Sequence, residues 1–232
     1  MLENKKVVVF DWDGTLANSV SQKVEAYVTA MLFYLIKSQA ISPKEDLESH
    51  SDRLRHFYYD QAGIPRGLII QKFFSAWNLF YDETDANILA ETISNIYLNC
   101  ASSVGLHDDV ETVIEHLVKL TKKIYISSAS PSAELLEVTS MVLSKALLAK
   151  VEAIFGSDGK FHKGSPHFDE ILRLEKISRS QLLFVGDDVH DQIIAEDYDI
   201  DFLRILRRNT RPMPFMATPN HLESLKELIH SE

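Results

Sequence analysis

The segment "VVVFDWDGTL", residues 7–16, ends an apolar run with two carboxylates that are separated by one residue. Asp11 and Asp13 repel each other at this spacing, so a function must offset the cost. An aspartate with a reference pKa of about 3.9 is ionised at neutral pH and can attack phosphorus, which gives an aspartyl-phosphate. The nucleophile cannot also carry the proton, so a second acid/base is needed nearby. Asp13 can fill that role because Gly14 permits a tight turn out of the strand.

Other polar side chains follow later apolar runs in the same way. Two hydroxyls follow "KIYI", three carboxylates follow "LLFVG", and a lysine comes between "VEAIF" and the helix start at "SP": they are Ser127, Ser128, Asp187, Asp188, Asp191 and Lys163. The carboxyl ends of parallel strands form the ligand-binding edge of an open α/β sheet, so we expect these groups to converge. Ser128 with nearby backbone N–H groups could hold phosphoryl oxygens, and Lys163 could neutralise their charge.

So many carboxylates at one edge would repel one another unless a cation lies among them. Oxygen ligands without His or Cys favour Mg²⁺, which proteins commonly hold with one or two carboxylates, water and substrate phosphate. An Asp-x-Asp-Gly segment alone can also be a surface turn, and a lone lysine before a helix is usually solvated. The presence of all the clusters together favours the magnesium site.

The elements that must position these groups are short strands separated by helices. Five apolar or β-branched runs predict strands, at residues 6–10, 123–126, 151–155, 182–185 and 201–206. Segments with one apolar helical face separate the later runs. Such alternation predicts right-handed crossovers and a parallel sheet covered on both faces. We therefore expect an α/β fold, a Rossmann-like three-layer sandwich.

The long stretch between the first two strands contains no convincing strand. It has helical stripes at residues 20–35, 68–80 and 88–98, and is too long for a crossover helix. We predict an inserted all-helical cap domain at 17–105, within a core domain formed by 1–16 and 106–232. Hinges are expected near 17–18 and 102–105.

Composition narrows the choice of partners. The 232 residues carry a formal net charge of −10, which disfavours a polyanion such as nucleic acid as primary partner. The single cysteine, Cys100, excludes an intramolecular disulfide framework, fits a reducing compartment, and is expected to pack in a helix. With no signal-peptide pattern and no apolar stretch long enough to cross a bilayer, a cytoplasmic location is expected. The expected partner is a small phosphorylated metabolite, and the expected state is a monomer or weak homodimer.

The motifs "DWDGTL", a serine after the second strand, an isolated lysine and "GDDVHD" occur in that order. In this the chain resembles the haloacid dehalogenase superfamily over essentially the whole sheet domain. The inserted helices resemble the small cap of the subgroup that contains phosphoglycolate phosphatase and β-phosphoglucomutase. The resemblance implies a Mg²⁺-dependent phosphatase that acts on a small phosphomonoester.

The resemblance also implies roles for individual residues. Asp11 would be the nucleophile and a Mg²⁺ ligand, and Asp13 the general acid/base whose backbone carbonyl also binds the metal. Asp187 would ligate Mg²⁺, with Asp191 or Asp188 in support through water. For phosphate binding, alignment with relatives similar to β-phosphoglucomutase favours Ser128 over Ser127, and Lys163 would be the phosphate-binding lysine.

Several alternatives share these groups. A sugar-phosphate mutase would use the same site, whereas the dehalogenase branch lacks a carboxylate at the position of Asp13 and is disfavoured. Phosphonate cleavage in the family uses a cap lysine, for which Lys72 is a weak candidate. A non-catalytic binding protein with this fold is a further possibility, although such proteins often lose one catalytic carboxylate.

Two basic groups are interpreted as solvated surface rather than as sites. The first is a run near the C-terminus, formed by Arg204, Arg207, Arg208 and Arg211. The second lies in the helical insertion and comprises Arg53, Arg55, His56 and Arg66.

Overall fold

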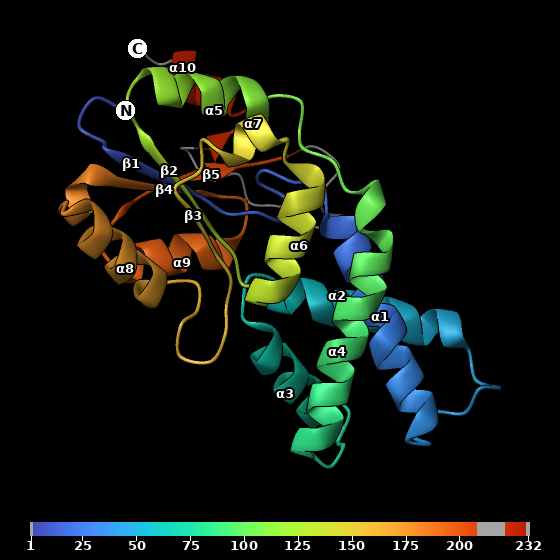
Figure 1. Cartoon of the computed structure of the whole chain (residues 1–232). Helices are drawn as coiled ribbons and strands as arrows, with labels where there is room; N and C mark the ends of the chain where they lie inside the picture. The colour runs from blue at the N-terminus through green and yellow to red at the C-terminus, as the bar shows by residue number, and fades with distance from the viewer. Residues whose placement is uncertain (1, 208–220, 231–232) are drawn as a thin grey trace.

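The computed structural model describes residues 2–207 and 221–230. Its centre is a parallel six-stranded sheet in the order β3-β2-β1-β4-β5-β6 (Figure 1). The strands are β1 (Val7–Phe10), β2 (Lys123–Ser127), β3 (Ala153–Phe155), β4 (Leu182–Gly186), β5 (Asp201–Ile205) and β6 (His221–Leu222). The predicted α/β class and all five predicted strands are confirmed. β6 was not predicted, since two residues are too few to give a pattern.

Helices cover both faces of the sheet and make the fold a three-layer sandwich (Figure 1). Alternate residues of β1 pack on opposite faces of the sheet: Val8 and Phe10 belong to one apolar cluster, and Val7 and Val9 belong to the other. The first cluster includes buried residues of α5 (Val110–Lys119), α6 (Ser132–Val142), α7 (Lys145–Leu148) and α10 (Lys226–His230). The second includes buried residues of α8 (Ser165–Glu175) and α9 (Val189–Asp197). Burial on both faces explains why β1 reads as an uninterrupted apolar run.

The first four helices after β1 precede α5 and form a bundle beside the sheet (Figure 1). They are α1 (Val20–Lys37), α2 (Leu47–Gln61), α3 (Arg66–Ala76) and α4 (Glu83–Cys100). Asp46 and Asp82 cap α2 and α4 by accepting backbone N–H groups of the first turn, as expected for N-cap aspartates. This bundle is the helical cap expected for the fold.

The two chain segments that connect the cap to the sheet domain run beside each other. The backbone N–H of Asn18 donates to the carbonyl oxygen of Gly105 at 2.8 Å, and His107 N–H donates to Leu16 at 3.0 Å. Paired backbone hydrogen bonds keep both connections in register. The precise domain boundaries stay a prediction.

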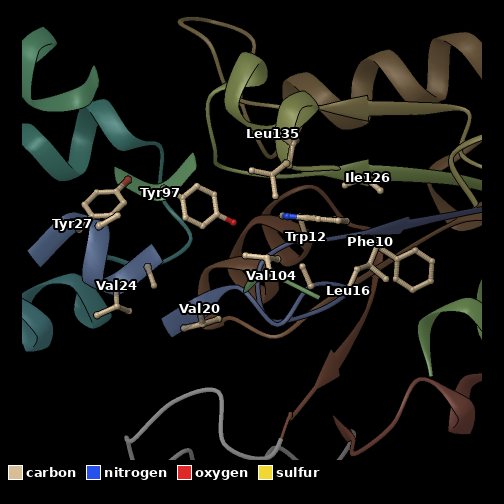
Figure 2. Packing of buried hydrophobic residues seen from close by; sticks show 14 of the residues in the cluster. Phe10, Trp12, Leu16, Val20, Val24, Tyr27, Tyr97, Val104, Ile126 and Leu135 are labelled. Carbon is tan, nitrogen blue, oxygen red and sulfur yellow. The ribbon is translucent and has the colours of Figure 1, made fainter. Parts of the chain in front are cut away.

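The cap and the sheet domain share one continuous apolar cluster. Figure 2 shows Trp12 and Leu135 of the sheet domain near Tyr97 of α4, with Tyr27 of α1 farther into the cap. Trp12, the residue between the two motif aspartates, is only 1% exposed. Burial of so large a side chain stabilises the junction and holds the motif against it.

The interpretation of Arg66 as a solvated residue is wrong. Its guanidinium is buried and contacts Glu134 of α6, so it joins the cap to the sheet domain. The surrounding helices supply enough polar partners to bury this charge, which a pattern of apolar residues does not reveal. Arg53 and His56 are exposed, and Arg55 pairs at the surface with Glu25.

The interpretation of the C-terminal arginines also needs correction. Arg204 is buried and donates from Nε to the carbonyl oxygen of Asp187 at 3.4 Å. Arg207 pairs with Asp109 at 2.7 Å and donates to the carbonyl oxygen of Thr15 at 2.8 Å. Both arginines therefore support the loops at the sheet edge, and Arg208 and Arg211 lie outside the described residues.

Cys100 is exposed at the end of α4 and not packed as expected. Among the described residues, no helix is long and apolar enough to cross a membrane.

Candidate active site

The register of the three central strands brings the polar clusters to one level. Phe10 of β1 pairs with Ile126 of β2 on one side and with Val185 of β4 on the other. Asp11, Ser127 and Gly186 are the next residues along these strands, so the chain leaves all three strands at the same edge. This is the edge at which open parallel sheets bind ligands.

Lys163 lies between two carboxylates at this edge. Its Nζ is 2.5 Å from Asp11 Oδ1 and 2.5 Å from Asp191 Oδ1, and all three side chains are buried. The loop before α8 holds the lysine in place, because Ser157 Oγ accepts the backbone N–H of Lys163 at 2.9 Å. A buried ammonium is tolerated here because two carboxylates surround it.

Three carboxylates form a compact acidic cluster: Asp11, Asp187 and Asp191 each offer an oxygen within 4.8 Å of the others. The backbone is shaped to allow this. A Cβ at Gly186 would lie 2.2 Å from Asp191 Oδ2, and one at Gly14 would lie 2.5 Å from Asp187 Oδ2. Gly14 also has φ +85°, a conformation that glycine adopts readily. The cluster, with the turn at Gly14 against it, fits a hard divalent cation such as Mg²⁺.

Asp13 points away from this cluster, toward the cap. Ser19 Oγ donates to its Oδ1 at 2.7 Å, and Ser130 Oγ donates to its Oδ2 at 3.2 Å. Lys23 of α1 forms an ion pair with the same Oδ2, and Ser128 Oγ lies 3.5 Å from it. The two motif aspartates therefore have different surroundings, as two groups with different chemical tasks require.

These surroundings shift the two pKa values in opposite directions. Burial raises the pKa of Asp11 to about 7, Asp191 and Asp13 add to the rise, and Lys163 opposes it. Burial would also raise the pKa of Asp13, but Lys23 and the donors Ser19 and Ser130 outweigh it, so the pKa lies below its usual value. Asp13 is therefore ionised at neutral pH in this state.

The structure separates the two candidate serines from each other, and likewise the two candidate aspartates after β4. Ser128 lines a cavity at the sheet edge, whereas Ser127 Oγ lies 2.8 Å from Nδ1 of the buried His167. Asp191 belongs to the acidic cluster, whereas Asp188 caps α9 by accepting the His190 N–H at 2.7 Å and also lines the cavity.

The cavity lies between the sheet edge and the cap. Its sheet-domain wall is polar and includes Asp11, Asp13, Ser128, Ser130, Lys163 and Asp187. Its cap wall is largely apolar or aromatic and includes Val20, Tyr27, Tyr58, Tyr59, Ile64 and Ile69. Lys23 supplies the cation among the lining residues of the cap. The polar wall suits an anionic group, and the cap wall suits the less polar part of a small ligand.

Sequence reasoning missed Lys23, although a signal was present. Lys23 lies on the apolar stripe of α1, between Val20, Val24 and Tyr27, where a charged residue needs a buried partner. Lys72, the weak candidate for a cap lysine, is exposed on α3 and donates to Gln61 at 2.5 Å. It does not line the cavity.

Comparison with known proteins defines the class. The family model for haloacid dehalogenase-like hydrolases matches residues 5–197, so the chain belongs to that family. The match covers β1 through α9 and thus every residue of the polar wall described above.

Solved structures with the same fold extend over the whole chain. A hydrolase from Pseudomonas syringae has a TM-score of 0.75 at 16% identity, with 98% of this chain and 97% of that chain covered. A predicted phosphoglycolate phosphatase from Haemophilus somnus 129PT gives 0.73 at 13% identity, with 99% of both chains covered. CbbY from Rhodobacter sphaeroides, in complex with phosphate, gives 0.73 at 13% identity, with 97% and 96% covered. None of the curated proteins compared matches the sequence.

Proposed function

We propose that the protein is a Mg²⁺-dependent phosphatase that hydrolyses a small phosphomonoester through an aspartyl-phosphate on Asp11. One observation carries the proposal: an acidic cluster, a buried lysine and a separately held second aspartate converge on one cavity. Membership of a hydrolase family and the likeness to phosphatase-named structures support it. The helices of residues 17–105 would act as the cap over this site.

Asp11, Asp187 and the backbone at Asp13 would hold the metal ion, with Asp191 in support. The ion supplies charge neutralisation for the phosphoryl oxygens and lowers the repulsion between the carboxylates. Lys163 and Ser128 would bind the remaining phosphoryl oxygens, so that phosphorus faces Asp11.

In the first step, an oxygen of Asp11 forms a bond to phosphorus while the bond from phosphorus to the leaving alkoxide breaks. Asp13 gives its proton to that oxygen, and the alcohol leaves. Asp13 must be protonated for this step, and a phosphate dianion beside it favours protonation because the like charge raises its pKa.

In the second step, water attacks phosphorus and the bond to Asp11 breaks. Asp13, now ionised, takes a proton from the water, and inorganic phosphate leaves. The ionised state of Asp13 in the present structure is the one that this step needs.

A phosphate-release screen tests the proposal. Purified protein with Mg²⁺ is offered sugar phosphates, phosphoglycolate, nucleotides and small acid phosphates. We expect hydrolysis of at least one small phosphomonoester and a loss of more than about 10³-fold in the Asp11→Asn variant. Asp52→Asn, which alters an exposed aspartate of α2, is the matched control and should retain activity. Unchanged phosphate release by Asp11→Asn would refute the proposal.

A further inference from the structure

Lys23 is a cap residue that reaches the catalytic groups of the sheet domain. It is the fourth residue of α1, and its side chain is only 8% exposed. Its ammonium forms an ion pair with Asp13 Oδ2 and a hydrogen bond with Ser130 Oγ, and lies 5.3 Å from the centre of the Tyr97 ring. Lys23 thus places a positively charged side chain of the cap in the cavity.

A contribution to folding stability does not readily explain the buried ion pair of Lys23 with Asp13. A buried ion pair is often no more stabilising than apolar side chains of similar volume, because both charges must lose water. The neighbours of Lys23 on α1, Val20 and Val24, are apolar, so an apolar residue at position 23 would continue the buried stripe. A lysine at this position therefore points to a role in the site.

The side of the site that the Asp13 carboxylate faces indicates a role for Lys23 in orienting this carboxylate. Asp11, two residues earlier, faces the acidic cluster and Lys163, whereas Asp13 faces the cap. A divalent cation at the cluster would attract the Asp13 carboxylate toward itself. Hydroxyl donors from Ser19 and Ser130 hold the carboxylate on the cap side, and Lys23 is its charged partner there.

We propose that Lys23 is a positioning residue for Asp13: its ammonium holds the carboxylate on the cap side of the site, facing the leaving-group oxygen and away from the metal ligands. The inference rests on the proposed phosphatase function. It also makes the cap part of the catalytic apparatus, since the sheet domain alone lacks this cation.

A double-mutant cycle between Lys23 and Asp13 tests the proposal, with kcat and KM measured on the best substrate of the screen. Lys23→Met should lower kcat by about 10- to 100-fold with little change in KM, because a misplaced acid/base slows the chemical step. In the Asp13→Asn background, measured at high enzyme concentration, the same change should alter kcat less than about threefold. Such loss of additivity is expected only if Lys23 acts through Asp13.

Controls separate positioning from folding and from substrate binding. Lys37→Met removes an exposed lysine of the same helix and should leave kcat unchanged. Melting temperatures are compared for every variant, and Lys23→Gln, with the same expected loss of kcat, replaces Lys23→Met if the latter fails to fold. Equal losses in both backgrounds, an effect confined to KM, or no effect would each overturn the inference. A wild-type chain that hydrolyses no phosphomonoester would instead refute the proposed function, and the inference with it.

Discussion

The guanidinium of Arg66 in the cap contacts both carboxylate oxygens of Glu134 in the sheet domain, at 2.9 and 2.7 Å. Both side chains are buried, and Ser94 of α4 donates to the same carboxylate at 2.8 Å. Glu134 lies in the first turn of α6, directly after the loop that carries Ser128 and Ser130. This contact therefore joins the cap to the part of the sheet domain that faces the cavity.

Replacement of Arg66 should destabilise the protein strongly. Arg66→Met leaves the Glu134 carboxylate buried without its cation, and such a change typically costs about 3–5 kcal/mol. The free energy of unfolding from urea titration measures the effect. The double variant Arg66→Met/Glu134→Leu removes both charges and should recover much of the loss.

The surface pair of Arg55 with Glu25 provides the matched control. Both side chains are substantially exposed, so Arg55→Met should cost less than about 1 kcal/mol. A similar loss for Arg55→Met and Arg66→Met would show that burial of the cap contact is not the source of the effect.

Magnesium should stabilise the folded chain through the acidic cluster. An ion that binds only the folded state adds RT ln(1 + [Mg²⁺]/Kd), which is about 2.7 kcal/mol at one hundred times Kd. We expect Mg²⁺ to raise the melting temperature of the wild type and EDTA to reverse the rise. Asp187→Asn should abolish it, whereas an unchanged rise in this variant would place the ion elsewhere.

Gly186→Ala should disrupt the cluster from the backbone side. The new methyl group would lie 2.2 Å from Asp191 Oδ2 and must displace that carboxylate. We expect a loss of phosphate release of at least about tenfold and a destabilisation of about 1–3 kcal/mol, as for other overpacked sites. Gly67→Ala is the control, because nothing lies within 4 Å of its added Cβ. In helix α3 it should be neutral or stabilising by up to about 1 kcal/mol.

His167 should make the stability depend on pH. Its Nδ1 lies 2.8 Å from Ser127 Oγ and its Nε2 lies 3.0 Å from the carbonyl oxygen of Gly156. Burial lowers the pKa of His167 to about 3, and the charge of Lys163 contributes to the decrease. In the unfolded chain His167 therefore binds a proton near pH 6.5, whereas in the folded chain it does so only near pH 3.

Stability should fall as the pH decreases between these values, by at most about 1.4 kcal/mol per pH unit from this residue. Urea titrations between pH 4 and 6 measure the slope for the wild type and for His167→Asn, in which it should be shallower by about one proton. His56→Asn alters an exposed histidine and should keep the wild-type slope. An unchanged slope in His167→Asn would contradict this account.

Much of the sheet could be predicted because burial leaves a direct mark on the sequence. Residues 7–10 and 182–185 are continuous apolar runs since the central strands are covered on both faces. The polar residues after them reveal the sheet edge, so the convergence of Asp11, Lys163 and Asp187 could be anticipated.

The contacts across the cap junction could not be predicted in the same way. Arg66 and Glu134 are 68 residues apart, and neither interrupts an apolar pattern that would flag a buried charge. Lys23 does interrupt an apolar pattern, the stripe of α1, so the sequence alone contains a signal that its charge is buried. Arg204 gains its partner only when β5 is placed beside β4. Arg207 gains its partners only when the segment after β5 lies beside the loops that carry Thr15 and Asp109.

Detection of an acid-quenched phosphoenzyme tests most directly whether the phosphoryl group is transferred to Asp11. Protein mixed with a labelled phosphomonoester and Mg²⁺ is quenched within milliseconds, digested and mapped by mass spectrometry. We predict an alkali-labile phosphoryl group on the peptide that contains Asp11, and none in the Asp11→Asn variant. A phosphoryl group on another residue, with phosphate release undiminished in Asp11→Asn, would contradict the account.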